Sequence, residues 1–250
     1  MSHATQYCIE NLNFHYNEVV DSVPPLNPTP HRWHGTLRAE RDSARRTRLL
    51  EAALELYGTD GFRRTSVQAL CQESGVSSRS FYELFSTQED VLEQLYIELN
   101  AEITTALAQP RVAEGSTLFD AASQIVSAAL SPMLRDERKA RVLEVESVGI
   151  SESMEERRRS TMRLIADSVR GAFTDLAASY ALDAPALSPA ESGDDLTGLI
   201  VVGGITEALV QRVGTPSESR CATSDFLGSI AEVVLRAHGI PDRQFHALPS

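Results

Sequence analysis

Apolar residues recur at helical spacing along most of the chain. Leu49, Ala52, Ala53 and Leu56 lie at positions i, i+3, i+4 and i+7, so they share one face of a helix predicted from about Ser43 to Tyr57. The same periodicity, broken by turn residues, predicts further helices at Ser77–Leu84, Gln88–Pro110, Thr117–Leu130, Arg135–Gly149, Ser153–Tyr180, Asp194–Val213 and Ala222–His238. Because no β-hairpin signal accompanies them, the pattern predicts an all-α fold.

The stretch from Ser66 to Phe85 predicts two short helices joined by a tight turn. Cys71 is a small residue at the expected helix crossing, Gly75 follows where the turn needs a positive φ, and Phe81 is the next apolar anchor. Small, glycine and apolar residues at these offsets are typical of the helix-turn-helix of DNA-binding proteins. From these residues alone, an ordinary αα-hairpin with a polar end is the alternative.

The sequence on either side of this stretch carries a family resemblance. The matching pieces are the run Leu49-Leu50-x-Ala52-Ala53 ending at Tyr57, then Gly61-Phe62, Thr65-Ser66-Val67, Gly75-Val76-Ser77, Phe81-Tyr82, Phe85 and Glu89 to Leu92. Together they make Arg45–Leu99, about a fifth of the chain, similar to the N-terminal domain of the tetracycline-repressor (TetR) family of bacterial transcription regulators.

The resemblance implies an all-helical homodimer. It implies an N-terminal three-helix DNA-binding domain with a helix-turn-helix at residues 43–89, and a helical ligand-binding and dimerisation domain at residues 90–250. Residues 1–42, which include the proline-rich VPPLNPTP, are expected to be a mobile extension. In the family, the last two helices build a four-helix dimer bundle. Here they are Asp194–Val213 and Ala222–His238, which are apolar nearly all round, as helices buried on more than one side are.

Eight residues are predicted to bind DNA. The second helix of the motif opens with small polar groups and one guanidinium, which a recognition helix presents to the major groove. Thr65 or Ser66 is expected to cap the first helix of the motif, and a capped helix N-terminus is also a seat for phosphate. The family pattern adds a phosphate contact from the Tyr82 hydroxyl. The full set is Arg45, Thr65, Ser66, Ser77, Ser78, Arg79, Ser80 and Tyr82.

Three positions depart from the family pattern. Gln88 stands where a phosphate-binding lysine is usual, Arg79 where a glycine is usual, and Glu83 where a basic or neutral residue is common. One lost cation and one added carboxylate should weaken the attraction to phosphate. Arg79, and an arm at Arg32–Arg46, would compensate.

The charge of the chain is acidic overall, at −12, but six arginines lie between Arg32 and Arg48 against only Glu40 and Asp42. Phosphate contacts are equally local, so the net charge does not exclude DNA binding. The arm either enters the minor groove or is a solvated basic start of a helix. The pair His31-x-x-His34 has a metal-like spacing, but with no further ligands nearby it is interpreted as two loop histidines.

A carboxylate on an otherwise apolar face suggests a ligand site in the second domain. Val142 and Leu143 precede Glu146 by four and three positions, and an unpaired buried carboxylate is costly. Glu146 is therefore predicted either to pair with an arginine of the next helix, such as Arg163, or to bind a ligand. The candidate ligand-binding residues are Glu146, Met162 and Phe173.

Composition and motifs exclude several other classes. The chain is 42% hydrophobic and 23% charged, with no apolar run near the ~20 residues of a membrane span and no signal-peptide pattern. Cys8, Cys71 and Cys221 are too far apart to predict a disulfide framework or a metal site. No catalytic motif appears, so we expect a cytoplasmic protein that is not an enzyme and carries no cofactor.

The sequence as a whole predicts a ligand-responsive transcription regulator of the TetR type. It would bind a palindromic operator on double-stranded DNA as a homodimer, act as a repressor, and be released by a small-molecule effector. One alternative is a regulator of the same fold that acts mainly through a protein partner or as an activator. Another is a helical enzyme with an unrecognised pocket.

Overall fold

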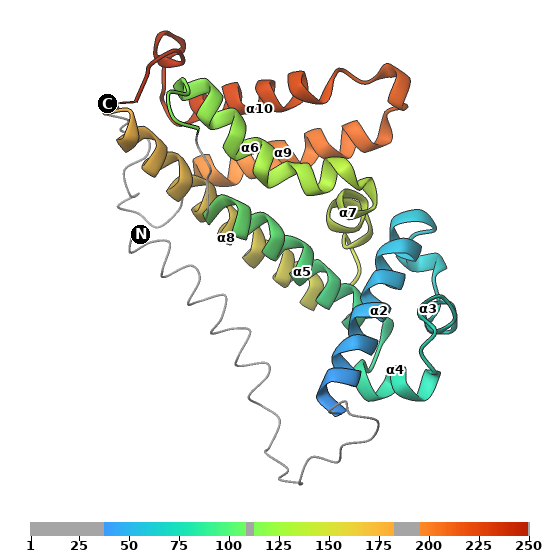
Figure 1. The fold of residues 1–250 in the computed structure, drawn as a ribbon. Coiled ribbons are helices and arrows are strands. Elements are labelled where there is room, and N and C mark those ends of the chain that lie inside the picture. Colours follow the sequence, from blue (N-terminus) through green and yellow to red (C-terminus); the bar gives the residue numbers. More distant parts are fainter. Residues whose placement is uncertain (1–37, 109–112, 183–195, 250) are drawn as a thin grey trace. The chain divides into compact units, whose positions relative to one another are not determined.

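The structure is a computed structural model that describes residues 38–108, 113–182 and 196–249. The predictions for residues 1–37, including His31 and His34 and the first part of the arginine arm, lie outside the described residues. Within the described ranges every regular element is a helix, which confirms the all-α fold. The chain divides into two compact units, residues 1–97 and 98–250, and the division falls within α5 (Gln88–Ala108) (Figure 1).

The first unit contains the helix-turn-helix. Its elements are α2 (Arg38–Thr59), the 3-10 helix η1 (Phe62–Arg64), α3 (Val67–Ser74), α4 (Ser78–Leu84) and the start of α5. α2 packs against α3 and η1, and α3 packs against α4. The core is formed by side chains with no exposed surface at the predicted apolar positions, among them Leu49, Ala53, Tyr57, Leu70 and Phe81.

Local chemistry explains where α3 and α4 begin and end. The Ser66 hydroxyl accepts a hydrogen bond from Ala69 N at 3.2 Å, and the Ser77 hydroxyl accepts one from Ser80 N at 3.2 Å, so each helix has a serine N-cap. Gly75 ends α3 with φ of 64°, in the left-handed region that favours glycine. The predicted turn is therefore formed at the predicted residue.

The second unit consists of helices that surround a common apolar core. Its elements are the end of α5, α6 (Leu118–Arg135), α7 (Glu137–Arg141), the π-helix η2 (Val142–Glu146), α8 (Glu152–Ser179), α9 (Leu196–Gly214), the 3-10 helix η4 (Ser217–Ser219), α10 (Thr223–Ala237) and the 3-10 helix η5 (Asp242–Gln244). α6 packs against α8 and α10, and α9 packs against α7, η2, α8 and α10. Phe173, Leu209 and Leu235 are among the most buried side chains.

Two predicted helix boundaries in this unit are wrong. α6 does not end before Pro132 but continues to Arg135. A proline inside a helix removes one backbone hydrogen bond, but the buried face of α6 continues past it to Met133, and this packing keeps the helix intact. The predicted helix Arg135–Gly149 is divided into α7 and the wider-turned η2, where Ser147 N donates to Val142 O, five residues back, at 3.2 Å.

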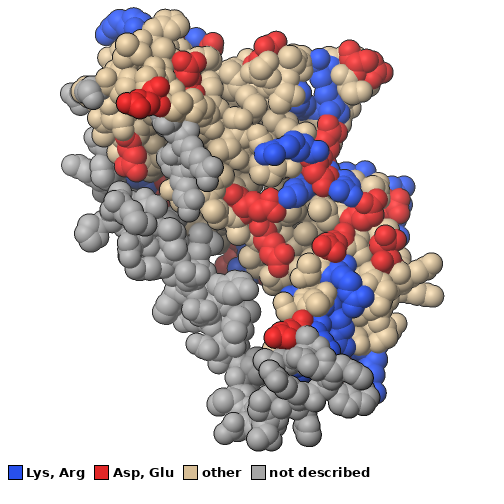
Figure 2. All heavy atoms as spheres, viewed as in Figure 1, with Lys and Arg blue, Asp and Glu red and all other residues tan. Residues whose placement is uncertain are grey.

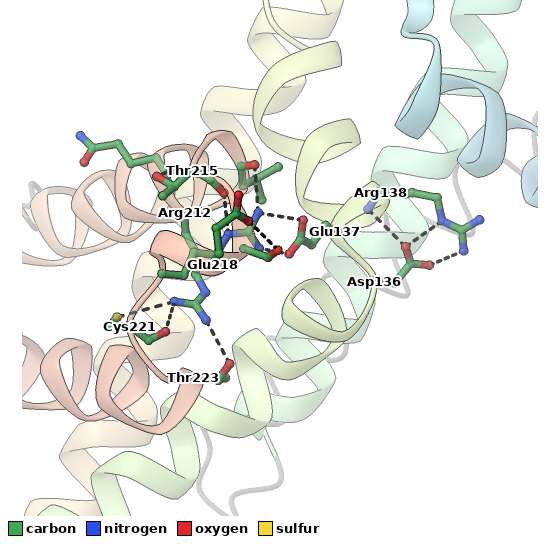
Figure 3. A network of polar contacts seen from close by, with 12 residues as sticks. Asp136, Glu137, Arg138, Arg212, Thr215, Glu218, Cys221 and Thr223 are labelled. Carbon is green, nitrogen blue, oxygen red and sulfur yellow. Dashed lines mark hydrogen bonds and ion pairs between the residues drawn. The ribbon is translucent and has the colours of Figure 1, made fainter.

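A polar network fixes α7 to the connection between α9 and α10 (Figure 3). Arg220 forms an ion pair with Glu137 of α7, and its Nε donates to Thr215 O at 2.7 Å. Arg212 donates to Thr223 Oγ1 at 3.0 Å and to Cys221 O at 3.2 Å. Because α7 leads directly into η2, the network holds the start of the π-helix in place.

Candidate functional site

The N-terminal part of α4 presents the predicted DNA-binding groups to solvent. Ser77 and Ser78 are exposed, the Arg79 side chain is 90% exposed and Tyr82 is 61% exposed. The Tyr82 ring packs edge-on against Phe81 at 5.2 Å between centroids, which anchors its base in the core while its hydroxyl stays outside. These four residues therefore form one exposed polar surface.

Ser80 and Arg45, unlike the four exposed residues, are partly buried and contact each other. Arg45 Nη1 donates to Ser80 Oγ at 2.9 Å, and Arg45 also forms an ion pair with Asp42. Both side chains are only partly exposed. The structure thus brings Arg45 and Ser80 together as a bridge between α2 and α4.

Thr65 is buried, and its hydroxyl has a partner within the chain. It is 9% exposed, and its hydroxyl donates to Gly61 O at 2.9 Å. Ser66, the neighbouring candidate, is exposed and caps α3. Of the two hydroxyls, Ser66 is therefore the one that a phosphate could approach.

Glu83 lies between two guanidinium groups. Its carboxylate accepts from Arg79 Nε at 3.3 Å and lies 3.9 Å from Arg45 Nη1. On the face of the molecule shown in Figure 2, basic and acidic side chains likewise lie next to each other. The carboxylate of Glu83 on α4 therefore neutralises part of the positive charge of the two neighbouring arginines.

Two further arginines of α2 support the motif, and sequence reasoning missed their role. Arg48 Nη1 donates to Ser74 O, and Arg46 Nη2 donates to Leu84 O, each at 3.4 Å. Ser74 and Leu84 are the last residues of α3 and α4, where backbone carbonyls lack helical partners and attract cations. The one indication in the sequence is that Arg45, Arg46 and Arg48 lie close together in the helix that precedes the helix-turn-helix.

Gln88 also has an internal partner. Its side-chain amide Nε2 donates to Phe62 O at 2.8 Å, and its backbone carbonyl accepts from the Tyr57 hydroxyl at 3.3 Å. The position where a phosphate-binding lysine was expected thus ties η1 and α2 to α5.

The second unit contains a partly open apolar cavity of about 70 Å³. Apolar side chains of α5, α6, α8, α9 and α10 line it, Phe173 among them, and its polar lining consists of Asn100, Glu144 and Thr206. Within the described ranges, no cluster of His, Cys, Asp or Glu side chains could hold a metal ion. The chemistry available in this unit is therefore the enclosure of a mostly apolar molecule next to one carboxylate.

The carboxylate that lines the cavity is Glu144, and not Glu146 as predicted. Glu146 accepts from Arg141 Nε at 3.0 Å, so it pairs with an arginine of the preceding helix and not with Arg163. Met162 is half-buried and lies outside the cavity lining. Because the turn of η2 is wider than that of an α-helix, the buried face that Val142 and Leu143 begin continues at Ser147, which has no exposed surface, and not at Glu146.

Burial shifts the pKa of Glu144. Burial raises the pKa of its carboxyl above the usual value, and the charge of Arg158 and a hydrogen bond from Thr206 lower that pKa by less. Arg158 itself donates to Leu143 O at 2.8 Å and to Ser147 Oγ at 2.6 Å. The guanidinium is thus committed to the backbone and hydroxyl of η2 and its flank.

α9 leaves much of its apolar surface uncovered. Among the described residues, α9 is the one helix long and apolar enough to cross a membrane by length and composition, and 22% of its most apolar window is buried within the chain. Leu196 and Ile200 of α9 and Val233 of α10 are 64%, 72% and 58% exposed. These exposed side chains lie on two helices that pack against each other.

The arrangement of α2, α3 and α4 is that of a helix-turn-helix domain. Residues 49–95 match the model of the bacterial regulatory proteins of the tetR family. The N-terminal domain therefore belongs to the TetR family, and the resemblance seen in the sequence is confirmed. No curated protein sequence matches the chain.

Solved structures share the fold of the chain. The transcriptional regulator FadR from Bacillus subtilis, in complex with stearoyl-CoA, is 18% identical and aligns over 76% of this chain and 98% of its own, with a TM-score of 0.61. GusR from Salmonella enterica is 20% identical over 78% of this chain and 95% of its own, with a TM-score of 0.56. At these identities the likeness establishes the fold, with its N-terminal DNA-binding and C-terminal helical domains.

Proposed function

We propose that the chain is a ligand-responsive repressor that binds a palindromic operator as a homodimer and is released by a small molecule. The observation that carries the proposal is the presence in one chain of an exposed α4 surface and a separate apolar cavity with a carboxylate in its lining. The first suits a DNA major groove, and the second suits an effector. Neither the cavity nor α4 presents a catalytic arrangement among the described residues.

The proposed dimer forms through α9 and α10. Its support is the exposed apolar surface at Leu196, Ile200 and Val233, which one chain leaves uncovered. The sequence pattern alone would also assign Ile205 to this interface, but Ile205 lines the cavity and so faces inward. A two-fold axis would place the two α4 helices in successive major grooves about 34–36 Å apart.

Release of DNA follows from a difference in affinity. An effector that fits the cavity in only one conformation of the second unit would favour that conformation, and a dimer with the wrong spacing of α4 would bind the operator less tightly. The effect is reciprocal, so operator DNA should weaken effector binding by the same factor.

A salt-dependent gel shift with DNA from upstream of the protein's own gene tests this proposal. We expect a discrete dimer complex that prefers this DNA over random sequence, with affinity that falls linearly in log salt. Equal binding to all sequences would contradict an operator-specific regulator. The alternative is a regulator that acts mainly through a protein partner. It is favoured by Gln88, which stands where a lysine is usual, and by Glu83, which stands where a basic or neutral residue is common. This alternative predicts weak DNA binding in the same experiment.

A further inference from the structure

Glu144 is a carboxylate in a mostly apolar enclosure. It lines the cavity next to Asn100 and Thr206, and the remaining lining is apolar. Transfer of an ionised carboxylate from water to such a site is costly unless a donor or cation accompanies it. The raised pKa of Glu144 is a consequence of that cost.

The protein supplies only part of the compensation. Thr206 offers one hydroxyl to Glu144, and the charge of Arg158 acts on it from a distance. Among the described residues, no arginine or lysine forms an ion pair with Glu144, whereas Arg158 donates to Leu143 O and Ser147 Oγ and lies 3.9 Å from the Glu155 carboxylate. The other nearby glutamate, Glu146, has its own arginine at 3.0 Å. Of these two carboxylates on η2, the one in the cavity is the one that lacks a partner cation.

The geometry points to a small hydrophobic amine as the molecule that this cavity binds, with its ammonium group against the Glu144 carboxylate and its hydrocarbon part among the apolar side chains. This inference deepens the proposed function, since it rests on that proposal for the claim that the bound amine is the effector. The claim that the cavity binds amines stands on the cavity alone.

Charge and size both restrict the ligand. An ammonium group would stabilise the ionised form of Glu144, whereas a carboxylate or phosphate beside it would repel that form, and both effects are strong in apolar surroundings. We therefore do not expect this cavity to bind an acyl-CoA such as the stearoyl-CoA in the FadR complex from Bacillus subtilis. A cavity of about 70 Å³ is roughly half of an engineered cavity of about 150 Å³ that holds benzene. The expected ligands are therefore amines of no more than about four carbon atoms.

The test measures binding to the full chain without DNA. Ligand-observed NMR at pH 7.5 would compare n-butylamine with n-butanol, which has the same shape and no charge, and with butyrate. Salt at about 0.15 M screens non-specific attraction of the amine to this acidic chain. We expect n-butylamine to bind at least about tenfold more tightly than n-butanol, and butyrate and stearoyl-CoA not to bind. Equal binding of amine and alcohol, or binding of either anion with no preference for amines, would overturn the inference.

Two matched variants locate the effect. Glu144→Gln keeps the shape of the side chain and removes the charge, so it should bring amine and alcohol to similar affinity. Retained n-butanol binding by this variant shows that its cavity is still folded. Glu146→Gln removes a carboxylate from the same π-helix, and it should keep the preference for the amine. Loss of that preference in Glu146→Gln but not in Glu144→Gln would favour the prediction from sequence and refute the assignment to Glu144.

The regulatory part has its own readout. If the chain binds its operator, n-butylamine should weaken that complex in wild type and not in Glu144→Gln. Amine binding by a chain that binds no operator would refute the proposed function and leave the cavity assignment intact. Operator binding by a chain that shows no preference for amines would refute the cavity assignment and leave the DNA-binding part of the proposed function intact.

Discussion

The first unit places its functional side chains mostly through contacts that are short in sequence, whereas the second unit assembles its cavity from distant helices. Ser66 and Ser77 cap α3 and α4 three residues away, and Gly75 turns the chain between them. The cavity is lined by side chains of α5, α6, α8, α9 and α10, which are far apart in the sequence. Its one carboxylate lies on the irregular helix η2. Short-range chemistry can be seen in a sequence pattern, and an assembled cavity cannot.

The largest test of this difference removes the core of the first unit alone. Phe81 has no exposed surface, and Phe81→Ala should cost about 3–5 kcal/mol of local stability. Hydrogen exchange should then rise across α2–α4 while α6, α8 and α10 keep their protection. Tyr82→Phe, at the exposed neighbour, is the matched control and should leave exchange unchanged. Equal loss of protection in both units would show that they unfold as one.

A charge on the exposed face of α9 tests the second unit. Ile200→Glu should weaken dimerisation at least about a hundredfold, roughly 3 kcal/mol, because a carboxylate would enter an apolar interface. Sedimentation measures the change, and operator binding should fail with it because the two half-sites are bound together. Leu248→Glu, a similarly exposed apolar position in the C-terminal tail, should change neither property. A fully dimeric Ile200→Glu would place the interface elsewhere.

Arg79→Ala tests base recognition at the exposed end of α4. An arginine fork matches guanine O6 and N7, so its loss should cost about 1–3 kcal/mol on the operator and relax the preference at one base pair per half-site. Binding to a panel of operator variants measures this. The same loss on every sequence would instead identify Arg79 as a phosphate contact.

Tyr82→Phe should have a smaller and uniform effect on DNA affinity. Removal of one hydrogen bond to phosphate costs about 0.5–1.5 kcal/mol and carries no base information. The ranking of the operator variants should therefore stay the same as in wild type. A reordered ranking would assign the Tyr82 hydroxyl to base recognition.

The smallest effect is expected from Glu144→Gln on stability without ligand. Because the pKa of Glu144 is raised in the folded chain, the folded state binds more protons than the unfolded chain between the unfolded and folded pKa values. Wild-type stability should therefore fall as pH rises through that window, and Glu144→Gln should remove this decline. Thr206→Val, which deletes a hydroxyl that lowers the pKa, should extend the decline to higher pH and so make it larger in total. Urea denaturation at a series of pH values measures all three proteins.

By itself, the sequence determined the helical fold, the helix-turn-helix and most of the exposed residues of α4. Helical periodicity, serine caps and a glycine at positive φ are local properties, and they act within a few residues. The same pattern identified α9 and α10 as helices with too much apolar surface for one chain to bury.

Only the tertiary structure decided which side chains of these helices face a site. The Thr65 hydroxyl donates a hydrogen bond to Gly61 O. Arg46 and Arg48 donate to backbone carbonyls at the C-terminal ends of α4 and α3. The wide turn of η2 continues the buried face at Ser147 and not at Glu146, and the packing of the surrounding helices places Glu144 at the cavity. Packing between distant helices selects among the polar groups that a local pattern can only propose.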